Sequence, residues 1–435
     1  MNYNQHRQKG LIGAGLAFLV CLTLSGTADA AYKIGDDESY VKIGGLLQGW
    51  AAINEGKAPD GEAWENEFYL RRMRLMFYGQ INKWVNFFVE TDNPNFGKGG
   101  DLSMNMFIQD AYLEFNIHEM FQLDIGMLLL PFSHHGMQGA TSLLGLDYHG
   151  ALVRYPGGST KVWRDYGVMV RGIFFTKWLE YRLGVFNGVH GNLKDTMEGG
   201  EGDVTWDEPA DPRNSRDWPR FTARLTFNIF EPEGGAGVGG MFYDGIYLKK
   251  TDEGVVSTKK VLSIGGSVDW QKDLNVTWDD PPGQSGVIPE DSLRTVKSRD
   301  SYVGAAGDVF LDIPLDAKKL WSLNGQVNFY YYNYGDRSEG NTWYDSIGDT
   351  KSYTGLGISS ELGIRYNAIQ PLFIFDWYNS TKAASDSTGD YMGVYGGFNY
   401  WLFGHSTSLK IQFGANQANG GDWGLAGTFQ AQLLF

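Results

Sequence analysis

The sequence predicts an all-β protein: a transmembrane, antiparallel, up-and-down β-barrel with one long loop folded into its lumen. Three observations predict this fold. Segments of alternating apolar and polar residues follow one another, their connectors alternate between short and long, and no apolar run after residue 30 is long enough for a membrane helix. Only helices and closed barrels satisfy their backbone hydrogen bonds in lipid, so we expect a barrel, with a soluble secreted β-protein as the alternative.

The first 30 residues have the features of a secretory signal. Basic residues precede an uncharged stretch from 10 to 24, and Ala28-Asp29-Ala30 offers a cleavage site of small residues. A membrane anchor, the alternative, would need roughly 20 apolar residues, which is more than this stretch provides. We therefore expect residues 1–30 to be cleaved and residues 31–435 to form a single outer-membrane barrel domain.

Alternating segments of about ten residues place strands along the remaining chain. The expected strands are 40–53, 67–80, 84–91, 106–117, 120–130, 164–175, 178–187, 218–230, 236–247, 259–270, 274–280, 300–312, 320–333, 352–367, 371–380, 390–402, 406–417 and 423–435. This pattern gives about 18 strands, with about 16 as the alternative count.

The connectors fall into two sets of different length. With the N-terminus in the periplasm, the periplasmic connectors are all short, namely 81–83, 118–119, 176–177, 231–235, 271–273, 313–319, 368–370 and 403–405. The outer connectors are mostly long and rich in Gly, Asp, Asn, Pro and Ser, namely 54–66, 92–105, 131–163, 188–217, 248–258, 281–299, 334–351, 381–389 and 418–422. Such sorting is typical of outer-membrane barrels, and a soluble sandwich has no reason to show it.

Residues 131–163 are expected to form one long loop. Counting the strand-like stretch 148–155 as a barrel strand would place the long connector 188–217 in the periplasm. The loop begins with an apolar sequence that is poorly suited to an open excursion into water. We therefore predict that it folds into the barrel and narrows the lumen, with His134 and His135 in this constriction.

The last strand alternates between two faces. Its apolar residues share one face and its polar residues the other, the apolar set being Trp423, Leu425, Phe429, Ala431, Leu433 and Phe435. This segment resembles the closing strand of bacterial outer-membrane barrels, which ends in an aromatic residue. The resemblance implies that Phe435 is part of the signal read by the insertion machinery.

The phase of each strand predicts which charged residues face the lumen. With Met73 and Leu75 toward lipid, the inward basic residues are Arg72, Arg74, Arg171, Arg182, Arg220 and Arg224. The inward acidic residues of the neighbouring strands are Glu90, Asp110, Glu114 and Asp124. Opposed basic and acidic walls would create a transverse field that orients solutes. In the alternative interpretation, the arginines pair with these carboxylates and stiffen the barrel.

Later strands add both signs of charge to the lumen. The further inward residues are Asp269, Asp308, Glu361, Arg365, Asp376 and Lys410. A lumen lined in this way is not expected to be a strict anion filter. Guanidinium groups nevertheless suit phosphate, because they offer forked donors and stay ionised.

Four segments carry a family resemblance. They are 70–80 (LRRMRLMFYGQ), 109–115 (QDAYLEF), 123–133 (LDIGMLLLPFS) and 219–228 (PRFTARLTFN). In this order they resemble the phosphate-selective porin O and P family, mainly over residues 67–230. The resemblance implies a 16-stranded barrel, usually trimeric, in which arginines and a lysine of the constriction loop guide anions. The chain departs from that pattern, because its loop has no lysine before Lys161.

Other kinds of site find little support. Adjacent histidines on an extended chain point apart, so His134, His135 and His149 are not expected to form a metal site. The acidic residues of connector 188–217 lack the spacing of a calcium loop. No catalytic motif is recognisable, and no cofactor is predicted. The formal net charge of −15 disfavours nucleic acid as a partner.

These patterns predict a channel in the bacterial outer membrane through which small hydrophilic solutes diffuse, with a preference for anions such as phosphate. The barrel is expected to contact outer-membrane lipid and to assemble as a homotrimer, as the resemblance implies. The alternative is an insulating sheath around a periplasmic multihaem cytochrome, which would be a separate partner because the chain has no C-x-x-C-H motif. A structural or adhesive surface protein would be expected to have one greatly enlarged outer domain, and an enzyme a recognisable catalytic set.

Overall fold

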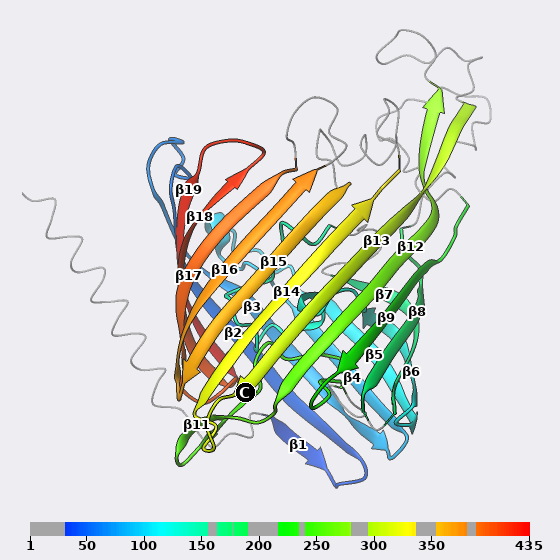
Figure 1. Cartoon of the computed structure of the whole chain (residues 1–435), viewed down its shortest axis with the longest axis vertical. Coiled ribbons are helices and arrows are strands. Elements are labelled where there is room, and N and C mark those ends of the chain that lie inside the picture. Colours follow the sequence, from blue (N-terminus) through cyan, green and yellow to red (C-terminus); the bar gives the residue numbers. More distant parts are fainter. Residues whose placement is uncertain are drawn as a thin grey trace, which may run out of the picture.

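The described residues form a closed antiparallel barrel of 16 strands (Figure 1). The computed structural model describes residues 31–154, 163–175, 177–189, 216–234, 240–279, 295–335, 354–380 and 389–435. The expected signal at 1–30 lies outside these residues. Each strand pairs with its neighbours in chain order, and the last strand closes the ring on the first.

The barrel strands are β2 (Tyr40–Asn54), β3 (Glu65–Asn82), β4 (Val85–Asp92), β5 (Phe107–His118), β6 (Phe121–Leu129), β7 (Arg164–Phe174), β8 (Leu179–Phe186), β9 (Arg220–Asn228), β12 (Val261–Asp279), β13 (Thr295–Pro314), β14 (Trp321–Asn333), β15 (Gly355–Tyr366), β16 (Ile369–Ser380), β17 (Tyr391–Trp401), β18 (Thr407–Ala418) and β19 (Gly424–Leu434). The other elements are β1 (Tyr32–Gly35), β10 (Leu248–Thr251), β11 (Gly254–Ser257) and the 3-10 turns η1 (Lys98–Gly100) and η2 (His135–Met137). β1 pairs with β2, and β10 pairs with β11 in a separate hairpin. No helix in the described part of the chain is long and apolar enough to cross a membrane.

The strand count is the alternative one, since two of the expected strands do not stand as separate barrel strands. The expected strand 274–280 continues β12 instead of following a turn at 271–273. A shift of register between Gln271 and Asn275 accommodates the extra residues, and Asp273 there has a φ of 51°. The polar residues that looked like a turn are therefore an irregularity within one long strand.

The other expected strand, 236–247, is not part of the barrel wall. Its described residues belong to the connector between β9 and β12, and Met241, Tyr243 and Ile246 are buried inside the barrel. The hairpin β10–β11 that follows lies beside the short turns of the periplasmic end, because Val255 N–H donates to Asn367 at 2.8 Å. Connector 248–258 was therefore wrongly predicted to lie outside. The expected strand 259–270 is the first part of β12 and runs opposite to its predicted direction, because the connector before it is periplasmic. The strands before and after β12 keep their predicted direction.

Two segments fill the lumen from opposite ends. We call residues 130–154 the inner loop and residues 240–257 the inner segment. They meet in backbone hydrogen bonds from Gly139 N–H to Tyr243 O and from Tyr243 N–H to Met137 O, both 2.9 Å. The structure thus confirms the prediction that the loop folds into the barrel, and adds a periplasmic connector that does the same.

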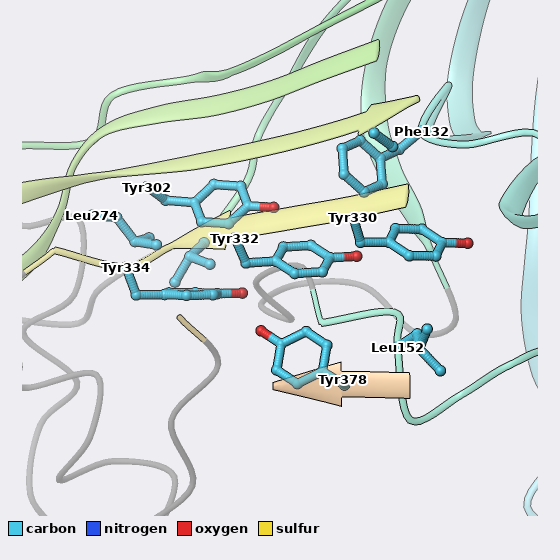
Figure 2. Close-up of a cluster of buried hydrophobic side chains, with 10 residues drawn as sticks. Phe132, Leu152, Leu274, Tyr302, Tyr330, Tyr332, Tyr334 and Tyr378 are labelled. Atoms are coloured by element: carbon cyan, nitrogen blue, oxygen red, sulfur yellow. The ribbon is translucent and has the colours of Figure 1, made fainter. Parts of the chain in front are cut away.

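Alternation divides the wall into a lipid face and a buried face. On β14, Phe329 and Tyr331 are exposed, whereas Tyr330 and Tyr332 are buried. Figure 2 shows the buried tyrosines packing against Phe132 of the inner loop. The aromatic run 329–332 on this strand therefore supplies only every second ring to the outside.

The ring closes between the C-terminus and β2. Gly45 N–H donates to Phe435 O at 2.7 Å, and Phe435 N–H donates to Gly45 O at 3.0 Å. The Phe435 side chain stays half exposed on the lipid face, while Gln430 and Gln432 are buried, as the alternation of the last strand predicts.

Replacing Gly45 by valine is expected to destabilise the barrel by about 1–3 kcal/mol. A Cβ atom at Gly45 would lie 2.6 Å from the ring of Phe435, so the terminal aromatic would have to move. The midpoint of urea unfolding in lipid vesicles measures this effect. Gly49→Val is the matched control, because a Cβ there meets nothing within 4 Å. Equal losses in both variants would contradict a role for the Phe435 contact.

Candidate solute pathway

The predicted charged residues all lie inside the barrel and are buried. Their side chains come from β3 to β9, and they are Arg72, Arg74, Arg171, Arg182, Arg220 and Arg224 together with Glu90, Asp110, Glu114 and Asp124. Alternation on a strand dictates this placement, because residues of one parity share one face. Their contribution to the passage of solutes is considered below as a proposal.

Arg74 is held by two carboxylates of β4. Its guanidinium lies 2.7 Å from Glu90 Oε1 and 3.0 Å from Asp92 Oδ2. Beside it, Arg164 at the start of β7 donates to both carboxylate oxygens of Asp110, at 3.1 and 3.0 Å. Arg164 was the first residue of the expected strand 164–175, and the phase that turns Arg171 inward would place it on the opposite face, so sequence reasoning missed it.

The predicted basic wall is likewise paired. Arg171 contacts Asp124 at 2.8 Å and also Glu114. Its neighbours pair in the same way: Arg182 with Glu180, Arg220 with Asp269, and Arg224 with Asp308. The buried arginines therefore adopt the alternative arrangement, in which neighbouring carboxylates compensate their charge.

β3 turns one more arginine inward than its phase predicts. Gln48 pairs with Arg72 and Gly49 pairs with Leu70, so Arg71 is an extra residue at a bulge. Arg71 Nε lies 2.6 Å from Asp147 Oδ2, and Arg72 contacts the same carboxylate. Burial alone would raise the pKa of Asp147, but the two guanidinium groups hold this pKa well below its usual range. Sequence reasoning missed Arg71, since an alternating pattern does not reveal a bulge.

A cavity of about 300 Å³ remains between the inner loop, the inner segment and the wall formed by β2, β3 and β4. Lys42 and Gly44 of β2 line it near the periplasmic rim. Arg74, Glu90 and Arg164 line it deeper in the lumen. The cavity thus connects the end of the barrel with the charged groups of the inner wall.

The two predicted constriction histidines are fully buried. His134 stacks on Phe310 with ring centroids 4.1 Å apart, and its Nε2 lies 2.7 Å from Glu233 Oε2. Its neighbour His135 has a donor beside each ring nitrogen, Gln326 Nε2 at Nδ1 and the backbone N–H of His149 at Nε2. Both histidines therefore anchor the inner loop to neighbouring residues and do not project into open lumen.

The closed barrel with a loop folded into a charged lumen defines a porin-type transmembrane protein. Residues 47–195 match the sequence model of the family described as phosphate-selective porin O and P, which confirms the resemblance seen in the sequence. The match and the fold together place the protein in the bacterial outer membrane as a channel-type barrel.

Solved porins share this fold. The outer membrane channel DcaP of Acinetobacter baumannii is similar with a TM-score of 0.52 at 12% identity, over 93% of this chain and 100% of that one. OmpF of Salmonella typhi, in a complex with daunomycin, gives 0.54 at 11% identity over 93% and 100%. OprB of Pseudomonas putida gives 0.50 at 9% identity over 91% and 94%. A search of curated proteins finds no match.

Proposed function

We propose that the protein is a narrow diffusion channel for small hydrophilic solutes. The observation that carries this proposal is the cavity along β2, β3 and β4, which joins the periplasmic rim to Arg74 and Glu90. The inner loop and the inner segment occupy other parts of the lumen, so this wall offers the path for solutes. A path lined by charged and hydrogen-bonding groups favours hydrated and polar solutes.

The preference for anions is the finer part of the proposal. Arg71, Arg72, Arg74 and Arg164 supply positive charge to this wall, and their partners are Asp147, Glu90, Asp92 and Asp110. Since each arginine has a carboxylate partner, we infer a modest preference for anions rather than a filter specific for phosphate. The paired charges would act mainly by orienting dipolar solutes.

Replacing Arg74 by alanine is expected to shift the channel toward cations, changing the permeability ratio by roughly a factor of two or more. The reason is that Glu90 and Asp92 would then lose their common cation, and Glu90 lines the cavity. The reversal potential in planar bilayers under a salt gradient measures the ratio, and phosphate added as a competitor tests for block. Arg216→Ala is the control, because its side chain is 58% exposed.

Two outcomes would contradict parts of this proposal. A purified, folded barrel that conducts no ions would remove the channel function itself. An unchanged reversal potential in Arg74→Ala would mean that ions do not pass along this wall. Strong block of current by phosphate, lost in Arg74→Ala, would instead favour a phosphate-selective site.

The other functions considered from the sequence, an electron conduit and an enzyme, have less structural support. A sheath around a multihaem cytochrome needs an open lumen, whereas the inner loop and the inner segment bury residues such as Leu143 and Tyr243 inside this one. We therefore propose a channel rather than an electron conduit or an enzyme. The homotrimer stays a prediction, which chemical crosslinking in native membranes tests.

A further inference from the structure

A cluster of buried histidine and carboxylate side chains lies where the inner loop meets β15 and β16. The loop supplies His135 and His149, β15 supplies Glu361, and β16 supplies Asp376. Ligand atoms of His135, His149 and Glu361 all lie within 4.8 Å of one another. The solute pathway described above does not use this cluster.

His149 lies between the two carboxylates. Its Nε2 is 3.1 Å from Glu361 Oε1, and its Nδ1 is 2.6 Å from Asp376 Oδ1. Despite the short distance, Nε2 has no hydrogen-bond partner of acceptable geometry among the described residues, although its residue is buried. The nitrogen and the Glu361 oxygen thus lie side by side, as two ligands of one ion do. Ligand atoms of a tetrahedral zinc ion lie roughly 3.3 Å apart, given bonds of about 2.0 Å.

The surroundings of His135 give a second, independent observation. Gln326 Nε2 lies 3.0 Å from His135 Nδ1, and the backbone N–H of His149 lies 3.1 Å from His135 Nε2. The orientation of the Gln326 amide is fixed, because its Nε2 also donates to Glu361 Oε2 at 2.6 Å. A neutral imidazole can accept at only one nitrogen, so these two donors compete for one lone pair. In either neutral tautomer, one ring N–H of His135 therefore faces a donor and has no acceptor among the described residues.

The carboxylates are already oriented for binding. Gln326 and the backbone N–H of Gly145 hold Glu361, the latter at 3.2 Å from Oε1. Asp376 faces the other nitrogen of His149, which is the position of the outer-shell carboxylate in many metal sites. Lys410 donates to the carbonyl oxygens of Leu143 and Gly145, so its ammonium group is engaged beside the cluster.

We propose that His135, His149 and Glu361 bind a divalent transition-metal ion, with Asp376 orienting His149. Two imidazoles and one carboxylate form a donor set suited to zinc. The ion would join the inner loop to the barrel wall and so fix its position in the lumen. From the sequence, His134, His135 and His149 were not expected to form a metal site. The fold of the loop brings His149 to His135, whereas His134 pairs with Glu233.

The test measures zinc bound to the full-length folded protein. Because the cluster is buried, zinc is added both to the folded protein and during refolding, and the bound metal is counted by mass spectrometry after dialysis. We expect one zinc ion per chain in the unsubstituted protein, and its loss in Glu361→Gln and in His149→Gln. His118→Gln is the control, since His118 lies at an exposed periplasmic turn.

The absorption spectrum of the cobalt-loaded protein provides a second readout. Intense visible bands that disappear in Glu361→Gln would report tetrahedral coordination by this cluster. If His149→Gln does not fold, His135→Gln and Glu361→Gln carry the test. No bound zinc after refolding, or equal zinc in the wild type and the cluster variants, would overturn the proposal. Neither result bears on ion conduction, so the channel function is tested separately.

Discussion

Replacing Tyr243 by alanine is expected to raise the single-channel conductance roughly two-fold or more, because the inner segment then no longer seals its part of the lumen. Tyr243 is the residue at which the inner segment joins the inner loop. Its ring lies over Arg182 at 4.9 Å and stacks on His134 at 5.1 Å, and its hydroxyl donates to Glu180 at 2.8 Å.

The same substitution is expected to lower the free energy of unfolding by about 3–5 kcal/mol, the usual cost of removing a buried aromatic ring. Glu180 would also lose a donor in a buried position. Conductance in planar bilayers and the urea midpoint in vesicles are measured on the same preparation. Tyr331→Ala is the matched control, because this tyrosine faces lipid with 40% of its surface exposed.

Conductance and stability together distinguish two roles of the inner segment, occluding the lumen and supporting the wall. Higher conductance with lower stability would show that the segment both occludes the lumen and supports the wall. Lower stability with unchanged conductance would contradict its role as an occluding element. In that case the solute path would lie wholly along β2, β3 and β4, independent of Tyr243.

The sequence was sufficient to predict the barrel because side chains on a strand alternate with a period of two residues. This rule placed Arg74, Arg220 and Glu114 inside, where the structure has them. A separate observation, the apolar residues of the inner loop, predicted that this loop enters the lumen, because such residues are poorly suited to water. The lengths of the connectors gave the directions of the strands, except for the expected strand 259–270.

The same rule could not predict where the chain departs from regular alternation. Residues 240–247 alternate like a membrane strand, but a strand against lipid and a segment packed inside a lumen bury similar side chains. The bulge at Arg71 and the irregularity near Asp273 depend on pairing with neighbouring strands, which a single sequence does not report. For this reason, Arg71 was missed and two strands were misplaced.

The alternation of side chains along a strand predicts which face of the wall a charged residue lies on, but it does not predict which residue pairs with it. Arg224 on β9 pairs with Asp308 on β13, two strands away in the sheet, because Gly265 of β12 leaves the space between them. A Cβ atom at Gly265 would lie 2.3 Å from Arg224 Nη2 and 2.4 Å from Asp308 Oδ1. The pairing of this lumen therefore depends on a glycine whose role is invisible in the alternating pattern.

Replacing Asp308 by asparagine is expected to destabilise the barrel by about 3–5 kcal/mol, the usual effect of leaving one member of a buried ion pair uncompensated. Arg224 Nη1 and Nη2 each lie 2.7 Å from an Asp308 oxygen, and both side chains are buried. An amide would present its N–H group to one guanidinium nitrogen and would remove the negative charge that Arg224 contacts through both of its terminal nitrogens.

The double variant Arg224→Met, Asp308→Leu separates the ion pair from simple packing. Since two apolar side chains avoid the desolvation of a buried charge, the double variant is expected to recover most of the stability lost in Asp308→Asn. Urea midpoints in vesicles measure all three proteins. Asp37→Asn is the control, because the pair of Lys33 and Asp37 lies on the surface and should not contribute measurably. A double variant less stable than Asp308→Asn would mean that the ion pair stabilises the lumen beyond what packing there can replace, and that the charges of this wall were retained for stability as well as for the field they create.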